Sequence, residues 1–363
     1  MDKLVISTHG NIESAKEFIN SLEKSQFNFC LVISYTETSE IPGITIAGAD
    51  KEFLKFTSPA DAEFLRHGHC KCIDTIPMSP DGKPTPALLT KVALDSAKIP
   101  HFIINAGSKI HPDIPHFDSQ LEFGKNISES KALSPEKVSE AVEFGKIIGR
   151  SISQPNQCLI IGESIPGGTT TALAVLKGFG INTSVSSSMP KNPIEIKNQT
   201  VSNALKRLKS DDPINVISEL GDPMIPVVAG ILSESSKTTR VILAGGTQMT
   251  AVLAFAKRIG YNKQNTAIGC TSYILDDDDA KFLETVKQID DIPVISVNPL
   301  LSESKFAGLR SYSEGFVKEG AGAGGCMIAS LLKSRMTSET VSYTHLRAHE
   351  TEADLVCRLL LEK

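Results

Sequence analysis

The chain has 363 residues, of which 40% are hydrophobic and 22% are charged, and its formal net charge is −5. This composition is typical of a globular protein, and the negative balance gives no reason to expect nucleic acid or an anionic membrane as a partner. The sequence shows no signal peptide and no apolar segment near the ~20 residues that span a bilayer. The seven scattered cysteines are typical of reduced thiols, so we expect a cytoplasmic protein.

The first 130 residues alternate short apolar runs with polar or glycine-rich turns. Two segments between the runs have helical periodicity, at residues 14–22 and 87–96. The apolar runs predict short strands at residues 4–6, 29–33, 44–46 and 102–104. Strands that alternate with helices are typical of parallel βαβ units, so an α/β fold is expected.

Residues 74–86 interrupt this alternation, because four of the thirteen residues are proline and exclude regular secondary structure. A rigid loop of this kind can line a binding site or simply connect two elements at the surface. Just before it, residues 67–72 contain two histidines and two cysteines, which are the residue types of a metal site. Their spacing is not that of zinc ligands, and the start of a strand with buried thiols is the better interpretation.

The alternation becomes regular from residue 134 onward. Ser134 is a natural N-cap and Pro135 suits the first turn, so a helix is predicted to about residue 151. Asp212-Pro213 and Asp222-Pro223 begin two further helices in a similar way. More strands are predicted at residues 158–161, 182–186, 240–244, 266–269 and 293–297. More helices are predicted at residues 172–179, 194–208, 308–318 and 326–333.

A glycine-rich turn at residues 162–171 joins a buried strand to the helix that follows. Strand, turn and helix in this order point backbone N–H groups and the positive end of the helix at an anion. The spacing almost matches a P-loop, but Gly168 stands where the lysine belongs. The turn can therefore hold a phosphate and is poorly equipped to activate a triphosphate. Residues 240–250 repeat the arrangement, with Gly245 and Gly246 in the turn.

Glu319 is the residue that we predict to be a catalytic base. Glycines follow it at positions 320, 322, 324 and 325, and such a density indicates close approach of another segment or positive φ angles. Partial desolvation of a carboxylate at this place would raise its pKa toward neutrality, as a general base requires. The alternative is an exposed glutamate at a helix start, which is favourable to the helix dipole and nothing more.

Three further candidates have weaker signals. Glu163 lies inside the glycine-rich turn, where it would repel a phosphate unless it points away, toward a base or a sugar. Lys197 could supply the cation that the turn lacks, or it could be a solvated helix lysine. Residues 276–279, four consecutive aspartates, could bind a cation or cap a helix in solvent.

Residues 337–363 do not continue the pattern. They resemble translated sequencing-adapter read-through, a peptide that recurs at the ends of unrelated predicted proteins. We therefore treat them as a non-native tail. The alternative is a natural C-terminal helix with an apolar stripe formed by Leu355, Leu359 and Leu360.

Four segments follow one another in an order and spacing that resemble a known enzyme family. They are residues 162–171, 212–230, 242–251 and 319–323. Over roughly residues 130–333 the chain is similar to the nicotinate-nucleotide–dimethylbenzimidazole phosphoribosyltransferases, and it is identified as a divergent member. Gly168 replaces an asparagine of the family, and Lys318 replaces the glycine before Glu319. The N-terminal third lacks the K-P-x-G-S-L-G stretch of the family.

The resemblance implies a single α/β domain over residues 1–336, in which residues 1–130 are divergent and residues 131–336 form the family-like core. The fold would be a mainly parallel sheet flanked by helices, a Rossmann-like three-layer α/β/α arrangement with a smaller helical subdomain. Ligands should bind beyond the carboxyl ends of the strands, where the glycine-rich turns lie. The resemblance also implies a homodimer.

The implied reaction transfers the 5-phosphoribosyl group from nicotinate mononucleotide to a benzimidazole-type base, giving the α-ribosyl 5′-phosphate of the cobalamin lower loop. Glu319 would take the proton of the acceptor base, and Glu163 would stabilise the cationic transition state. The scheme needs small-molecule substrates and neither a metal nor a redox cofactor. The residues expected to bind phosphate and substrate are Ile165, Gly167, Gly168, Thr169, Thr170, Lys197, Gly245, Gly246, Gly320 and Gly322.

Two other functions stay open. A P-loop-like kinase or NTPase would need the missing lysine at position 168 and a clear Walker B aspartate. A nucleotide-binding protein without catalysis is the second, and the retained Glu319 argues against it.

Overall fold

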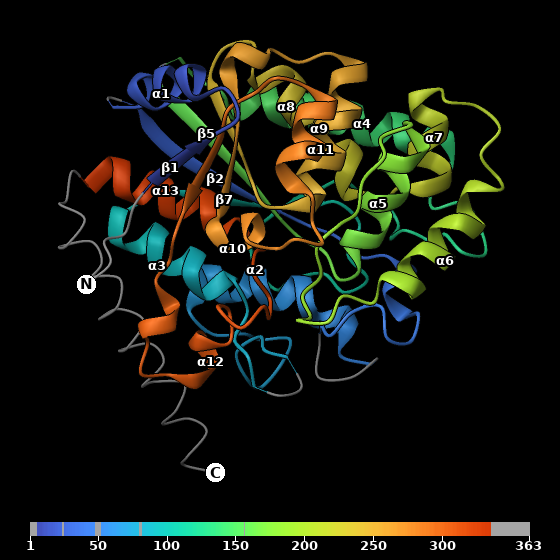
Figure 1. Cartoon of the computed structure of the whole chain (residues 1–363), viewed down its shortest axis with the longest axis horizontal. Coiled ribbons are helices and arrows are strands. Elements are labelled where there is room, and N and C mark those ends of the chain that lie inside the picture. Colours follow the sequence, from blue (N-terminus) through green and yellow to red (C-terminus); the bar gives the residue numbers. More distant parts are fainter. Residues whose placement is uncertain (1–5, 24, 48–51, 80–81, 156, 335–363) are drawn as a thin grey trace.

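A computed structural model describes residues 6–23, 25–47, 52–79, 82–155 and 157–334 (Figure 1). The predicted tail at 337–363 and most of the strand predicted at 4–6 lie outside these residues. No helix in the described part of the chain is both long and apolar enough to cross a lipid bilayer.

The described residues form an eight-stranded sheet with the order β1-β8-β7-β6-β5-β2-β3-β4. Six of the seven neighbouring pairs are parallel, and β1 is antiparallel to β8. The strands are β1 (Ile6–His9), β2 (Gln26–Ile33), β3 (His101–Asn105), β4 (Phe117–Asp118), β5 (Gln157–Ser164), β6 (Arg240–Ala244), β7 (Thr266–Thr271) and β8 (Val294–Val297). The predicted α/β class with a mainly parallel sheet is confirmed.

Helices cover both faces of the sheet and enclose two apolar cores (Figure 1). One core is covered by α4 (Pro135–Ile152), α5 (Gly168–Gly178), α6 (Ile194–Leu205), α7 (Pro213–Leu220), α8 (Met224–Ser235), α9 (Thr247–Ile259) and α11 (Phe282–Ile289). The other is covered by α1 (Ile12–Ser21), α2 (Thr57–His67), α3 (Ala87–Ala97) and α13 (Ala323–Ser334). Two short helices, α10 (Ser272–Leu275) and α12 (Ala307–Arg310), lie in connections.

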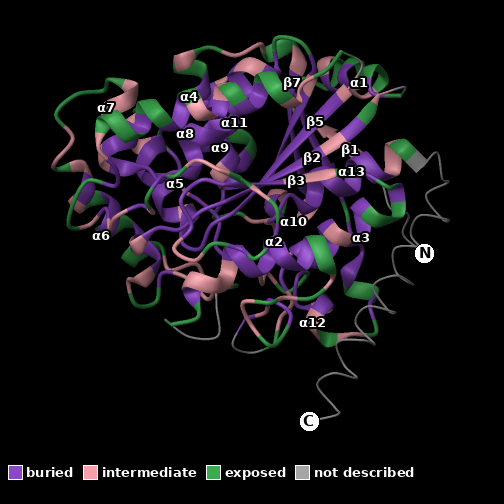
Figure 2. Cartoon of the chain, turned by 180° about the vertical axis from the view of Figure 1, so that it is seen from behind, coloured by how far each residue is buried: buried purple, intermediate pink, exposed green. Residues whose placement is uncertain are grey.

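The central strand β5 shows why the apolar runs became buried strands. Its side chains alternate between the two cores, with Leu159 and Ile161 in one and Cys158 and Ile160 in the other. A parallel strand buried on both faces needs apolar residues at every position, since successive side chains point to opposite faces. Figure 2 shows the sheet as an almost wholly buried layer between the helices.

The chain reverses its direction of travel across the sheet between β2 and β5. From β2 it proceeds outward to β3 and β4, and after β5 it proceeds the other way to β6, β7 and β8. The loops that leave β2 and β5 therefore diverge at the carboxyl end of this strand pair. In open α/β sheets, such a switch point leaves a crevice where ligands bind.

Four predicted elements are wrong, of which the first three are two strands and a helix. Residues 44–46 are not a strand, and residues 182–186 are irregular, with the carbonyl of Val185 bonded to the Asn192 side chain instead of a neighbouring strand. The helix predicted over 308–318 is reduced to α12 and turns. Gly315, Val317 and Lys318 have φ angles of 90°, 60° and 60°, which no right-handed helix contains.

The segment after α2 is not the predicted start of a strand with buried thiols. Residues 68–75 contain no strand, and Cys70 and Cys72 are only partly buried. The Glu63 carboxylate accepts the N–H groups of Lys71 and Cys72, so these donors need no neighbouring strand.

Helices α4 and α8 pack backbone to backbone at Gly145 and Gly230. A Cβ atom at position 145 would lie 2.2 Å from the Val227 carbonyl oxygen, so the contact requires glycine. We expect Gly145→Ala to lower the free energy of unfolding by about 1–3 kcal/mol through overpacking. Chemical denaturation measures this, with Ile147→Ala, a side chain of the same helix that is 54% exposed, as the control. Equal stability of the two variants would contradict the close packing.

Candidate active site

A cavity of about 550 Å³ opens at the switch point, beyond the carboxyl ends of β2, β5 and β6. Eight of the residues predicted for the site line it: Glu163, Ile165, Gly167, Gly168, Thr169, Gly246, Glu319 and Gly320. The predicted place of the site, at the carboxyl ends of the strands, is thus a real cavity. Four predicted residues do not line it: Thr170, Lys197, Gly245 and Gly322.

Two helices present their N-termini to this cavity. Helix α5 follows Gly167, which has a φ of 75°, and α9 follows Gly246. Neither helix has a side-chain hydrogen bond at its N-cap, so no side chain satisfies the first-turn N–H groups there. The two turns therefore direct amide dipoles toward one space, an arrangement that attracts an anion.

Glu319 is held in place by three backbone amides. Its Oε2 accepts from the Thr271 N–H at 2.6 Å, and its Oε1 accepts from Gly320 at 3.1 Å and Gly324 at 3.2 Å. Burial raises the pKa of this carboxyl group, and the three amide hydrogen bonds oppose that shift. Amides at the end of β7 and the start of α13 thus orient the Glu319 carboxylate. The residue is also part of the cavity lining.

The backbone before Glu319 is strained. Val317 and Lys318 both have a φ of 60°, which is a genuine outlier for a β-branched residue. Two successive i to i+2 hydrogen bonds accompany these angles, from Lys318 N–H to the Phe316 oxygen and from Glu319 N–H to the Val317 oxygen. Backbone strain of this kind persists only where the surroundings fix it, and it is concentrated at functional sites.

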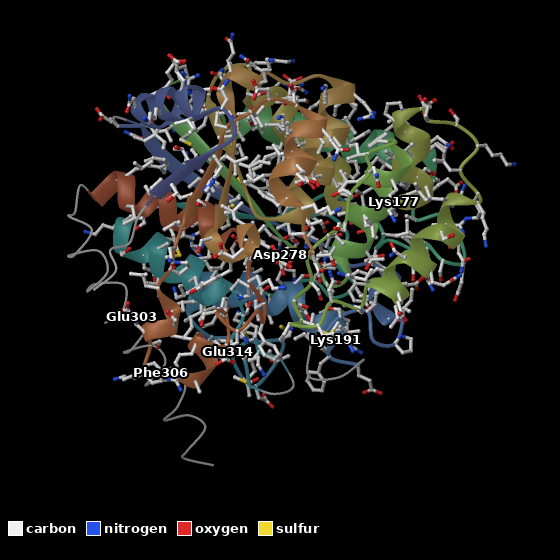
Figure 3. All side chains as sticks on the ribbon, viewed as in Figure 1. Lys177, Lys191, Asp278, Glu303, Phe306 and Glu314 are labelled. Carbon is white, nitrogen blue, oxygen red and sulfur yellow. The ribbon has the colours of Figure 1, made fainter. Side chains whose placement is uncertain are left out.

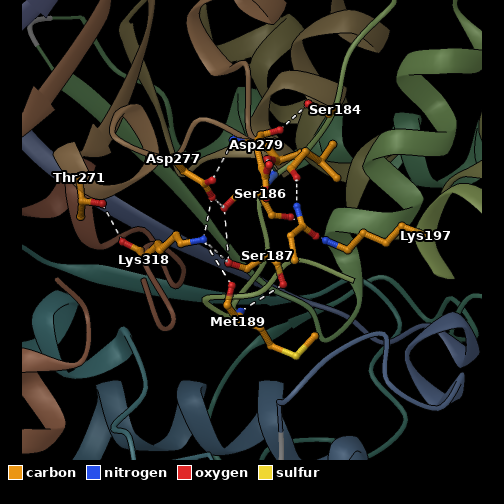
Figure 4. Close-up of polar contacts among 12 residues, drawn as sticks. Ser184, Ser186, Ser187, Met189, Lys197, Thr271, Asp277, Asp279 and Lys318 are labelled. Atoms are coloured by element: carbon orange, nitrogen blue, oxygen red, sulfur yellow. Dashed lines mark hydrogen bonds and ion pairs between the residues drawn. The ribbon is translucent and has the colours of Figure 1, made fainter. Parts of the chain in front are cut away.

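The Lys318 side chain holds this strained backbone in place (Figure 4). Its ammonium lies 2.7 Å from Asp277 Oδ2 and donates to the Ser187 carbonyl at 3.2 Å, and both side chains of the pair are less than 10% exposed. Asp277 also accepts from the Ser186 hydroxyl at 2.6 Å. The four aspartates at residues 276–279 are therefore not only a solvated helix cap, because Asp277 is the buried counter-ion of Lys318.

The same network fixes one wall of the cavity, the segment Ser186 to Ser188. Val317 N–H donates to the Ser188 carbonyl at 2.9 Å, and Lys197 donates to the Ser186 carbonyl at 2.7 Å (Figure 4). Lys197 therefore lies behind the wall, and burial, followed by the charge of Lys318, lowers its pKa to about 7.

A cluster of buried carboxyl groups surrounds the glycine-rich turn. Burial, aided by the charges of Asp222, Glu319 and Asp61, raises the pKa of Glu163 to about 8. Burial also raises the pKa values of Asp61 and Asp222 to about 6 each. The raised pKa favours the protonated form of Glu163 at neutral pH.

Asp61 and Asp222 are residues that sequence reasoning missed. Asp61 accepts from the hydroxyls of Thr85 and Ser164, both at 2.7 Å, and so joins α2, the proline-rich loop and the end of β5. Asp222 accepts from the Thr171 hydroxyl at 2.6 Å and caps α8. The Asp222-Pro223 pattern predicted a helix cap and no role at the cavity. No sequence pattern indicated a role for Asp61, which lies inside a helix.

The N-terminal third provides most of the apolar lining of the cavity. The proline-rich loop contributes residues 73–79 and 83–86, so it lines the cavity instead of connecting two elements at the surface. Phe53, Phe56 and Ile76 are among the apolar side chains there. The Thr57 hydroxyl, in the same lining, is buried without a hydrogen-bond partner. This part of the cavity suits a mainly apolar group with few polar atoms.

Comparisons with known proteins place the chain in a family. A family model described as "Phosphoribosyltransferase" matches residues 95–272. A UPF0284 protein of Archaeoglobus fulgidus is 50% identical over 304 residues, which are 84% of this chain and 88% of that protein. A UPF0284 protein of Saccharolobus solfataricus is 43% identical over 318 residues, 87% of this chain and 90% of that one. The chain belongs to the UPF0284 protein family.

Two solved structures share the fold of this chain. The nicotinate-nucleotide-dimethylbenzimidazole phosphoribosyltransferase of Thermus thermophilus has a TM-score of 0.61 and 16% identity, covering 91% of this chain and 88% of that one. The Thermus thermophilus CobT structure has a TM-score of 0.57, also at 16% identity, covering 91% and 95%. Lys318, a departure from the enzyme family that the sequence resembles, is explained by the structure, because Asp277 pairs with it.

We expect Asp277→Asn to destabilise the protein by about 3–5 kcal/mol, since it leaves the buried Lys318 ammonium without its counter-ion. Chemical denaturation measures the change. Asp278→Asn is the matched control, because this neighbouring carboxylate, labelled in Figure 3, is exposed. Equal effects of the two substitutions would show that the pair does not hold the segment.

The pH dependence of stability should report on Glu163. Its folded-state pKa of about 8 exceeds the ordinary 4.5, so the stability that it contributes is complete below pH 4.5 and is lost as pH rises toward 8. Glu163→Gln removes this loss. We expect the difference in Tm, variant minus native protein, to increase by several degrees between pH 5 and pH 8.5. A constant difference, as expected for exposed Glu314→Gln, would contradict the shift.

Proposed function

We propose that the protein transfers the 5-phosphoribosyl group of nicotinate mononucleotide to a benzimidazole-type base. The product would be an α-ribosyl 5′-phosphate, the precursor of the cobalamin lower loop, and nicotinate would be released. The observation that carries the proposal is the position of Glu319, fixed by three amides at a cavity that combines uncapped helix N-termini with an apolar lining.

The two kinds of lining match the two ends of the proposed substrates. The 5′-phosphate would lie at the turns that begin α5 and α9, with Gly167, Gly168 and Thr169 providing amides. The acceptor base would lie against the apolar side chains of the N-terminal third. Lys197 would act on the phosphate only indirectly, through the Ser186 segment that it holds.

The reaction breaks one C–N bond and forms another. A ring nitrogen of the acceptor attacks C1′, and the electron pair of the old bond passes to the nitrogen of nicotinate. Glu319 takes the proton from the other ring nitrogen of the acceptor, and its raised pKa makes it a better base. No water needs to be activated, so a site enclosed by protein is an advantage.

Glu163 would respond to the donor's charge. Its raised pKa favours the protonated form at neutral pH. The pyridinium charge of nicotinate mononucleotide favours the ionised form of a carboxyl group nearby. The resulting carboxylate stabilises the cationic, oxocarbenium-like transition state.

The alternatives from the sequence receive less support. Lys83 is the one lysine or arginine among the described residues that line the cavity, and it comes from the proline-rich loop and not from the glycine-rich turn. A kinase needs a cation that bridges the β- and γ-phosphates. The homodimer and the cytoplasmic location implied earlier remain parts of the proposal.

The deciding experiment incubates the protein with nicotinate mononucleotide and 5,6-dimethylbenzimidazole and measures released nicotinate. We expect Glu319→Gln to reduce turnover ~10²-fold or more while nicotinate mononucleotide still binds, because the proton acceptor is lost. Exposed Glu314→Gln, in the same segment, is the control and should keep full activity. Full activity of Glu319→Gln would remove Glu319 as the base. Release of phosphate from ATP by the native protein would favour the kinase instead.

A further inference from the structure

Three side chains that commonly bind metals meet at the edge of the sheet, outside the cavity. They are His111, His116 and Asp118, and one potential ligand atom of each lies within 4.8 Å of the others. Asp118 belongs to β4, the outermost strand, and the two histidines lie in the connection that leads into it. Because His111 and Asp118 are partly exposed, an ion could reach the cluster from solvent.

A backbone hydrogen bond selects the ligand nitrogen of His116. Its Nδ1 lies 2.8 Å from the Ile114 carbonyl oxygen. A carbonyl oxygen can only accept, so Nδ1 is the donor, and Nε2 is the nitrogen that has the lone pair in the neutral imidazole. Protein metal sites use this arrangement to orient a ligating imidazole and to fix its tautomer.

The carboxylate of Asp118 is oriented in a comparable way. Its Oδ1 accepts from the Asn105 side-chain amide at 3.3 Å and from the Gln120 N–H at 2.9 Å. Asn105 is itself buried and fixed, since its Oδ1 accepts from the Ser108 N–H at 2.8 Å. The other carboxylate oxygen, Oδ2, faces His111 and lies 3.5 Å from its Nδ1.

We propose that His111, His116 and Asp118 form a binding site for a divalent transition-metal ion of the Zn²⁺ type. Two imidazoles and one carboxylate are a ligand set that zinc accepts, with water in the fourth position. Mg²⁺ and Ca²⁺ prefer oxygen ligands and are poor candidates. The cluster lies outside the cavity and has no part in the reaction above, so the proposal does not depend on the proposed function.

The ion would fasten the outer edge of the sheet. Strand β4 is only two residues long and is paired with β3 through Ile104–Phe117 and Asn105–Asp118 alone. A metal ion bound by His111, His116 and Asp118 would join this short strand to the connection that precedes it. Binding to the folded state alone then stabilises the protein by mass action.

The test is a calorimetric titration of the metal-free, tag-free full chain with Zn²⁺ and, separately, Mg²⁺. We expect the double variant His116→Ala/Asp118→Ala to bind one Zn²⁺ fewer than the native protein. The single variant His111→Ala, which removes a side chain that is 59% exposed and so disturbs the core little, should weaken that site at least 10-fold. Zn²⁺ should also raise the Tm of the native protein by several degrees, and Mg²⁺ should not.

The matched control is the double variant His67→Ala/His69→Ala. These two rings stack, with centroids 5.5 Å apart, but among the described residues no carboxylate completes a three-ligand group with them. The control should keep the native Zn²⁺ stoichiometry and Tm shift. Unchanged stoichiometry in the His116/Asp118 variant, an unchanged affinity in His111→Ala, or loss of the site in the control would each overturn the proposal.

Discussion

The buried pair of Lys318 and Asp277 is the interaction on which the candidate active site depends. It connects the segment before Glu319 with the Ser186–Ser188 wall, which are far apart in the chain. The positive φ angles at 317 and 318 are unfavourable for residues with side chains, so an isolated segment would relax. The ion pair and its hydrogen bonds hold the unfavourable backbone in place, and Glu319 acquires its orientation from that backbone.

The cavity combines opposite electrostatic elements within a small space. Helix N-termini at α5 and α9 favour an anion, whereas Glu163, Asp61 and Glu319 favour a cation or a proton donor. A nucleotide whose phosphate is negative and whose glycosidic bond carries a positive ring satisfies both requirements. The raised pKa of Glu163 reflects its burial and the negative charges of the neighbouring acids.

The parts of the fold that the sequence predicted well are those set by local patterns. Ser134 accepts from Lys137 N–H as an N-cap, and Asp212 caps α7, both as the capping residues indicated. The apolar run at 158–161 became β5, and the glycine-rich turn became the start of α5. Prediction failed at residues 44–46, 67–72, 182–186 and 308–318, where side-chain hydrogen bonds or positive φ angles replaced regular structure.

The sequence by itself determined the α/β class, the glycine-rich turns and Glu319 as the candidate base, because periodicity, caps and glycine spacing are local properties of a chain. Only the tertiary structure decided that Lys197 lies behind the cavity wall and that Asp61 and the proline-rich loop line the cavity. It also decided that Asp277 is the counter-ion of Lys318. The reason is physical: burial, pKa shifts and ion pairing depend on groups that folding brings together from distant positions, and no local pattern records those distances.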